Sequence, residues 1–156
     1  MLADLQEFTA TVDPVWQWLV IMLAAAAPFI ESYGAGPIGI IAGVSPWIAI
    51  AAAIIGNIVS MVLVVLLAGR VRGATGADEQ PLTPRRARFK KRFDNWGVPG
   101  VSLLGQTLLP SQITSGLMVG FGASRQRVIV WQIISITLWG VGFGLLASGF
   151  VAAITA

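Results

Sequence analysis

Residues 47–68 read WIAIAAAIIGNIVSMVLVVLLA. No charged residue interrupts this stretch, and at about 1.5 Å per residue a helix made from it would reach about 33 Å. The hydrocarbon core of a bilayer is about 30 Å thick. The stretch therefore predicts a helix that crosses a membrane.

The rest of the chain shares this apolar character. Of its 156 residues, 56% are hydrophobic and only 11% are charged, whereas about 25% are charged in ordinary soluble domains. Uncharged runs cover residues 14–30, 32–69, which includes the stretch above, 95–124 and 128–156. We therefore expect an integral membrane protein with four apolar segments. Because the chain has no cysteine and no histidine, we expect neither an enzyme nor a zinc site, and we predict no cofactor.

The positions of the cations predict the topology. All ten Lys and Arg residues lie in the central linker or beside the last apolar run. The positive-inside bias would place both regions in the cytoplasm of a bacterium, so that the protein is a multi-pass protein of the inner membrane. The N-terminal region carries Asp4, Glu7 and Asp13 and no cation, so we expect it outside and the first segment retained. Topology explains the pI of about 10.2 more simply than nucleic-acid binding does.

Glycine and proline interrupt two of the apolar segments. Residues 32–46 hold four glycines and two prolines, a composition typical of broken backbone at membrane depth. We interpret residues 14–46 as a re-entrant helical hairpin with its tip at residues 31–37, followed by a span at 47–68. Residues 97–122, with a tip at 106–112, and a span at about 126–150 repeat this order.

The predicted fold is thus an all-α membrane protein made of an inverted repeat. The first repeat covers residues 1–69, the second covers 96–156, and a basic cytoplasmic linker at 70–95 joins them. Inverted repeats with broken helices are an architecture of secondary transporters, which predicts a substrate site between the two tips. Four full spans with both termini on one side of the membrane are the alternative.

The linker contains a second, smaller feature. Residues 84–94 predict a short basic helix on the membrane surface, with Phe89 and Phe93 on one face. Its cations would contact lipid headgroups. They are Arg85, Arg86, Arg88, Lys90, Lys91 and Arg92. A solvated topology signal without specific lipid contacts is the alternative.

Glu31 is the best candidate for chemistry, because it is the only charged residue between Asp13 and Arg70. A carboxylate in hydrocarbon is costly, and burial favours its protonated form, so one group can hold a proton or a cation in turn. The alternative is a solvated carboxylate at the outer interface. The full set of predicted substrate- or proton-binding residues is Glu31, Tyr33, Pro37, Asn57, Gln106, Thr107, Pro110 and Gln112.

Several of these residues also have a purely structural interpretation. Asn57 can join helices through its amide, and the polar residues around Pro110 can satisfy broken backbone. Glycine pairs four residues apart, at 39/43, 116/120 and 140/144, predict close helix contacts within or between chains. The G-x-G-x-x-G pattern at 34–39 lacks the strand and acidic residue of a dinucleotide site.

Five short motifs carry a family resemblance: PFIESY at 28–33, GN at 56–57, PRRAR at 84–88, FDNWG at 93–97 and GQTLLPSQ at 105–112. Together they resemble actinobacterial proteins described as small multidrug efflux or export proteins. The hairpin-plus-span plan also looks like the broader DedA-type superfamily, which is implicated in lipid-carrier translocation and proton-linked drug tolerance.

The resemblance implies a transporter. The acidic position of the DedA-type proteins corresponds to Glu31, but Gln106, Ser111 and Gln112 flank Pro110 where those proteins have arginine. Because arginine would bind a phosphate headgroup, its absence favours a cationic or neutral substrate. We expect proton-coupled export of hydrophobic or cationic compounds. The alternatives are a lipid or lipid-carrier flippase and a non-transporting scaffold. Four segments are few to enclose a pathway, so we also expect a homodimer.

Overall fold

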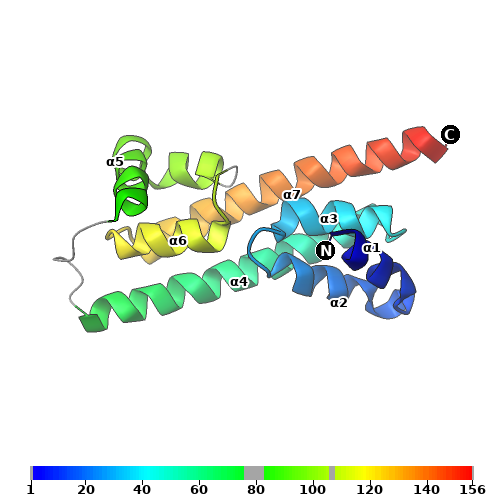
Figure 1. Ribbon diagram of the computed structural model, residues 1–156, viewed down its shortest axis with the longest axis horizontal. Helices are drawn as coiled ribbons and strands as arrows, with labels where there is room; N and C mark the ends of the chain where they lie inside the picture. Colours follow the sequence, from blue (N-terminus) through cyan, green and yellow to red (C-terminus); the bar gives the residue numbers. More distant parts are fainter. Residues whose placement is uncertain (1, 76–82, 106–107, 156) are drawn as a thin grey trace. The chain divides into compact units, whose positions relative to one another are not determined.

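The computed structural model describes residues 2–75, 83–105 and 108–155. Across these ranges the chain forms helices and turns without a strand, which confirms the predicted all-α class. The helices, shown in Figure 1, are α1 (Leu2–Thr11), α2 (Pro14–Ala25), α3 (Glu31–Ile41), α4 (Pro46–Thr75), α5 (Pro84–Gly105), α6 (Ser111–Gly120) and α7 (Arg125–Thr155).

Two of the described helices are long and apolar enough to cross a membrane. They are Pro46–Val71 in α4 and Arg125–Thr155 in α7, and they contain the predicted spans at 47–68 and 126–150. In the most apolar 18 residues of each helix, only 39% are buried in α4 and 33% in α7. The core helix of a soluble protein is mostly buried. Leu146, for example, is 70% exposed. The chain is therefore compatible with a membrane protein.

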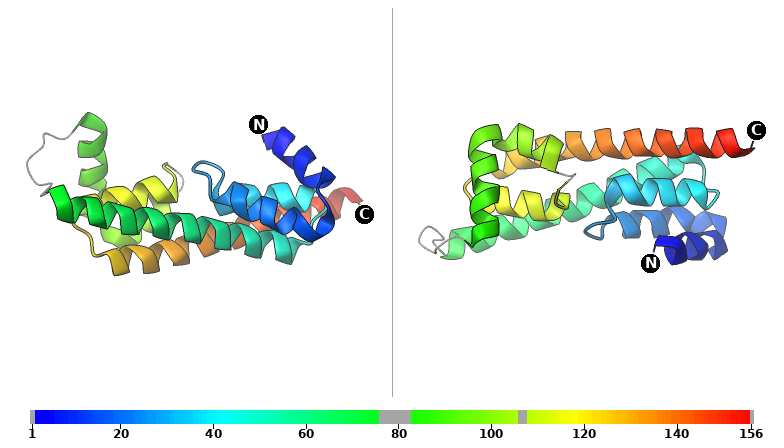
Figure 2. Two further views of the ribbon diagram at one scale, coloured as in Figure 1. Left: turned by 90° about the horizontal axis from the view of Figure 1, so that it is seen from below. Right: turned by 45° about the horizontal axis from the view of Figure 1, so that its top comes forward.

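The described helices form two compact units. Unit 1 comprises Met1–Ser60 and Ile136–Ala156, and unit 2 comprises Met61–Ser135. Helices α4 and α7 are continuous in both views of Figure 2, so each contributes one part of its length to each unit. The predicted repeats at 1–69 and 96–156 are defined by the order of elements in the sequence, and they stay a prediction.

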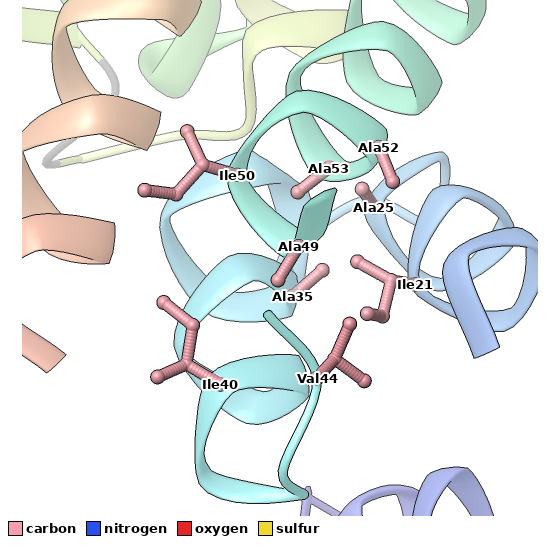
Figure 3. Close-up of a cluster of buried hydrophobic side chains, with 9 residues drawn as sticks. All are labelled: Ile21, Ala25, Ala35, Ile40, Val44, Ala49, Ile50, Ala52 and Ala53. Carbon is pink, nitrogen blue, oxygen red and sulfur yellow. The ribbon is translucent and has the colours of Figure 1, made fainter. Parts of the chain in front are cut away.

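Small side chains make up most of the core of unit 1. Figure 3 shows nine buried side chains from α2, α3, the turn after α3, and α4, and most of the alanines among them come from α4. Glycines bring the helices closer still: a Cβ on Gly39 would lie 2.3 Å from Ile21 Cδ1, and one on Gly56 only 1.9 Å from the Met22 carbonyl oxygen. Backbones can approach this closely only where the side chain is absent.

The position of the first turn corrects the sequence prediction. The chain turns at residues 26–30, upstream of the predicted tip at 31–37, and residues 31–41 form one helix with Pro37 inside it. The glycines of this segment, which the composition suggests as helix breakers, have a different role. Gly36 and Gly39 face the neighbouring helix α4, with Ala53 Cβ and Ala49 Cβ at 3.8 and 3.2 Å from the positions of an added Cβ. They serve close packing rather than a break.

Helix α3 ends where glycine is required. Gly43 has φ +95°, its N–H donates to Ile40 O, and the N–H of Val44 donates to Gly39 O. These two bonds form a Schellman motif, in which the residue with positive φ is usually glycine. Gly43 therefore ends the helix and has no atom within 4 Å of an added Cβ, so the predicted close helix contact is wrong for this glycine.

Unit 2 contains the basic helix and the second pair of short helices. Helix α5 consists of two helices that meet at Gly97, where φ is +63°. Its first part confirms the predicted helix at 84–94, and its second part lies in residues 97–122, the segment predicted as the second hairpin. Phe89 stacks on Phe121 with ring centroids 6.1 Å apart, which fixes the basic helix against the end of α6.

Helix α1 is not predicted by the sequence pattern. It contains no cation, and Thr9 is its only buried residue among those described. The Gln17 side chain donates to Thr9 O at 3.1 Å and so joins α1 to α2.

Candidate functional site

Glu31 is completely buried, with an exposed fraction of 0%. It is the first residue of α3 and follows the turn at residues 26–30 directly. Phe29, two residues earlier, is 70% exposed. The turn thus directs an aromatic ring outward and a carboxyl group inward. The sequence singles out Glu31, and the structure places it among buried residues, not at an exposed cap.

The backbone around Glu31 is strained. Phe29 has φ +74° and Glu31 has φ +50°. Residues other than glycine rarely adopt such positive φ values. Each such residue costs about 1–3 kcal/mol, and residues of this kind are concentrated at functional sites. A relaxed turn would place glycine at both positions, so the chain keeps two side chains where backbone geometry disfavours them.

Ser32 anchors the start of α3 to α7 within unit 1. Its Oγ donates a hydrogen bond of 3.1 Å to Ile136 O, and both it and Glu31 are fully buried. The contact needs a glycine on α7, because a Cβ on Gly140 would lie 3.1 Å from Ser32 Oγ and 2.8 Å from Ile54 Cγ1. One turn later, a Cβ on Gly144 would lie 2.3 Å from Ile50 Cγ1. The predicted 140/144 contact is therefore confirmed, and it lies within one chain.

A chain of aromatic rings begins at Tyr33, close to this acidic group. Tyr33 is close enough to Glu31 to interact with it electrostatically, and its ring centroid lies 6.0 Å from that of Phe143. Phe143 in turn lies 5.7 Å from Trp139. Rings of this kind attract cations through their electron-rich faces. A carboxyl group near a chain of three aromatic rings is suited to a hydrophobic cation.

The structure also describes the other two predicted site residues of unit 1, Asn57 and Pro37. Asn57 is fully buried in the middle of α4, directly after Gly56, which contacts the α2 backbone. Pro37 lies inside α3, where it lacks the N–H that would close a helical hydrogen bond. The structure therefore brings Glu31, Tyr33, Pro37 and Asn57 into one unit.

Unit 2 buries polar groups but no charge among its described residues. Pro110 is the N-cap of α6, and Gln112 is 3% exposed. The Ser115 hydroxyl donates to Ser111 O at 2.6 Å, and Thr114 Oγ1 lies 3.4 Å from Leu109 O. The predicted residues Gln106 and Thr107 lie outside the described part of the chain.

Sequence reasoning missed a polar group on α7. Gln132 and Ser135 are fully buried, and Ser135 Oγ donates to Ser102 O at 2.7 Å. Within the described residues, both amide atoms of Gln132 and the hydroxyl oxygen of Ser102 have no hydrogen-bond partner. The signal is present in the sequence, because Gln132 and Ser135 are three residues apart and share a helix face in an otherwise apolar span.

The cations of the basic helix are arranged unequally. Lys90 pairs with Asp94 at 2.8 Å, and the Arg86 guanidinium lies 5.7 Å from the centre of the Phe121 ring. Arg85 and Arg88 are exposed. Arg92 lines a hollow between the basic helix and the second short hairpin, formed by the end of α5 and α6. The lipid contact predicted for these residues stays a prediction.

No family model, curated protein or solved structure matches the chain. Its function therefore has to be inferred from its own residues. Across the described ranges there is also no group of three or more acidic side chains that could hold a metal ion.

Proposed function

We propose that this chain is a small secondary membrane transporter in which the Glu31 carboxyl group exchanges a proton for a hydrophobic cation. The observation that carries the proposal is the complete burial of Glu31 in a chain whose surface is largely apolar. A buried carboxyl group is expensive in hydrocarbon unless it is protonated, paired or hydrated, and acidic residues at such depth mark proton and ion pathways. During exchange the carboxyl group would alternate between two of these states: protonated, and paired with the cation.

The helix lengths support a re-entrant architecture. Helices α2, α3 and α6 have 12, 11 and 10 residues, so they extend only about 15–18 Å, roughly half of a hydrocarbon core. Helices α4 and α7 are long enough to cross it. In the proposed membrane topology, α2 with α3 and the end of α5 with α6 form two hairpins that enter from opposite sides, each followed by a span.

The ends of α3 and α6 support an internal repeat. Gly122, like Gly43, has a positive φ, of +101°, and its N–H and that of Ala123 donate to Val119 O and Met118 O. The same Schellman motif thus precedes both long helices. A serine follows two residues after each glycine, and Ser45 O and Ser124 O accept the N–H groups of Ala49 and Val128 at 3.0 Å. The two segments share a local design as well as an order of elements.

The distribution of charge supports the orientation of the repeat. The basic linker and Arg125 would lie in the cytoplasm of a bacterial inner membrane, and both termini would lie outside. Because the chain has no cysteine, single cysteines can be introduced for labelling without further changes. Residues 83–90 should be labelled only from the inside and residues 2–11 only from the outside. Labelling of both regions from the same side would contradict the hairpin topology and favour four full spans.

The side chains favour a cationic substrate over a lipid phosphate. Pro110, Ser111 and Gln112 provide no positive charge at the start of α6, whereas a phosphate would require arginine there. Tyr33 near Glu31 and the rings of Phe143 and Trp139 that continue from it suit a cation. This supports the export function implied by the family resemblance over the flippase alternative, and a scaffold would not need a buried acid. A homodimer would supply the helices that one copy lacks for enclosing a pathway.

Transport in proteoliposomes tests the proposal. With an imposed pH gradient, the wild-type protein should drive accumulation of the hydrophobic cation ethidium, and Glu31→Gln should abolish it. The amide has nearly the shape of the carboxyl group and is cheaper to bury, so the variant should fold. Glu7→Gln is the matched control, because it removes an exposed acid from α1. Undiminished coupled uptake by Glu31→Gln would refute the proposal.

A further inference from the structure

We propose that unit 2 holds one anionic phospholipid, with its phosphate on Arg92 and part of an acyl chain in the adjacent hollow. The inference deepens the proposed function, since it relies on the basic linker facing the cytoplasmic leaflet. The general prediction is that six cations are attracted to the membrane surface. The more specific inference is one lipid site with one essential cation, Arg92.

The basic helix presents a mixed face to the hollow. Phe89, Arg92 and Trp96 all line it, and their spacing of three and four residues places them on one side of the helix. One cation therefore lies between two aromatic residues along this face. This order matches an interfacial lipid, whose charged headgroup adjoins an apolar chain.

The opposite wall belongs to the second hairpin. Leu108 and Leu109 provide apolar surface there, and Thr114, which is fully buried, contributes the one polar side chain of that wall among the described residues. Together with the open solvent at its mouth, the hollow comprises about 280 Å³ that no atom fills. A wall with so little polar surface does not suit a free phosphate ion, whereas it suits hydrocarbon attached to a phosphate.

Arg92 is available to an anion. Asp94, the nearest acid in the sequence, is bound to Lys90 at 2.8 Å, and no carboxylate among the described residues pairs with Arg92. The Arg86 guanidinium is directed to the Phe121 ring. A guanidinium can bind a phosphate through two parallel hydrogen bonds, which an ammonium group cannot do.

The basic helix is held in place for this role. The Phe89–Phe121 stack fixes it to the end of α6, and the positive φ of Gly97 turns the chain into the second part of α5. The hollow is therefore formed by packed elements of a single unit.

Lipid binding to the full-length protein can be measured by native mass spectrometry in detergent. Phosphatidylglycerol should remain bound and phosphatidylcholine should not. Arg92→Gln should weaken phosphatidylglycerol binding about tenfold, because it removes a charge-assisted, bidentate contact. Arg88→Gln is the matched control: Arg88 is exposed like Arg92 but does not line the hollow, so its loss should weaken binding by about twofold, as expected for one distant surface cation at moderate salt.

Two further measurements distinguish a specific lipid site from a general electrostatic attraction between the basic helix and lipid. Arg92→Lys keeps the charge but loses the forked geometry, so it should lie between wild type and Arg92→Gln. Soluble glycerol phosphate at the same concentration should not displace the lipid. Equal losses for Arg92→Gln and Arg88→Gln, or full displacement by glycerol phosphate, would overturn the proposal. Lipid binding in detergent needs no proton gradient, so failure of coupled transport would leave this result unaffected.

Discussion

At the start of α3 a carboxyl group, that of Glu31, is fully buried, whereas the described start of α6 buries Ser111 and Gln112 and no charged side chain. The two segments otherwise resemble each other: each short helix ends in a Schellman motif with glycine, and a serine then precedes a long helix. The difference indicates that the backbone pattern shared by the two segments does not require Glu31. The positive φ of Glu31, +50°, is a conformation that costs stability in a residue other than glycine.

The largest effect expected from this comparison is on packing. A Cβ on Gly56 in unit 1 would lie 1.9 Å from a backbone oxygen, that of Met22, whereas one on Gly120 in unit 2 meets no atom within 4 Å. Gly56→Ala should lower the free energy of unfolding by about 3 kcal/mol, at the upper end for overpacking. Gly120→Ala should be neutral or raise it by up to about 1 kcal/mol. Reversible unfolding in mixed micelles measures both, and equal effects would contradict the close contact between α2 and α4.

A smaller effect is expected at Gln132. Its buried amide has no hydrogen-bond partner among the described residues, and such a group costs about 1–3 kcal/mol. Gln132→Leu should therefore raise the free energy of unfolding by about 1 kcal/mol, while the exposed control Gln126→Leu should leave it unchanged. A large loss of stability in Gln132→Leu would show that the amide is satisfied in the folded protein.

The smallest expected effects concern the two serine contacts. Ser32 Oγ donates to Ile136 O in unit 1, and Ser135 Oγ donates to Ser102 O in unit 2. Hydrogen bonds between helices in a membrane are worth about 0.6 kcal/mol on average, so Ser32→Ala and Ser135→Ala should each cost about that much. If Ser32 also positions the acid, only Ser32→Ala should change the pH dependence of transport. Equal pH profiles for both variants would assign Ser32 a structural role alone.

Much of the fold can be predicted because apolar length and charge are local properties. Residues 47–68 and 126–150 have the length and composition of spanning helices, and residues 84–94 have those of a separate basic helix. The position of the first turn cannot be predicted, because glycine permits both a break and a close contact, and only the neighbouring side chains decide between them. Gly39 lies opposite Ile21, a contact that its place in a glycine-rich segment does not reveal.

The candidate site also contains residues that the sequence predicts and residues that it does not. Glu31 can be identified because a lone charge in an apolar run is conspicuous. Gln132 is easily overlooked because a single uncharged amide in a span changes its hydropathy little. Among the described residues its amide has no hydrogen-bond partner. This depends on how α7 packs against other helices, which the sequence pattern of α7 alone does not predict. The burial of Ser32 beside Glu31 likewise depends on Gly140, more than a hundred residues away in the sequence.

Proton release on substrate binding tests the central role of Glu31 most directly. Ethidium is titrated into the purified protein in weakly buffered detergent solution, at several pH values, while released protons and bound ethidium are counted together. If proton and cation compete for the carboxyl group, binding should weaken as the pH falls through its pKa, and each ethidium bound below that pKa should release close to one proton. Glu31→Asp should shift the pH at which binding weakens, and Glu31→Gln should release none. Equal proton release by wild type and a folded Glu31→Gln variant would contradict the account.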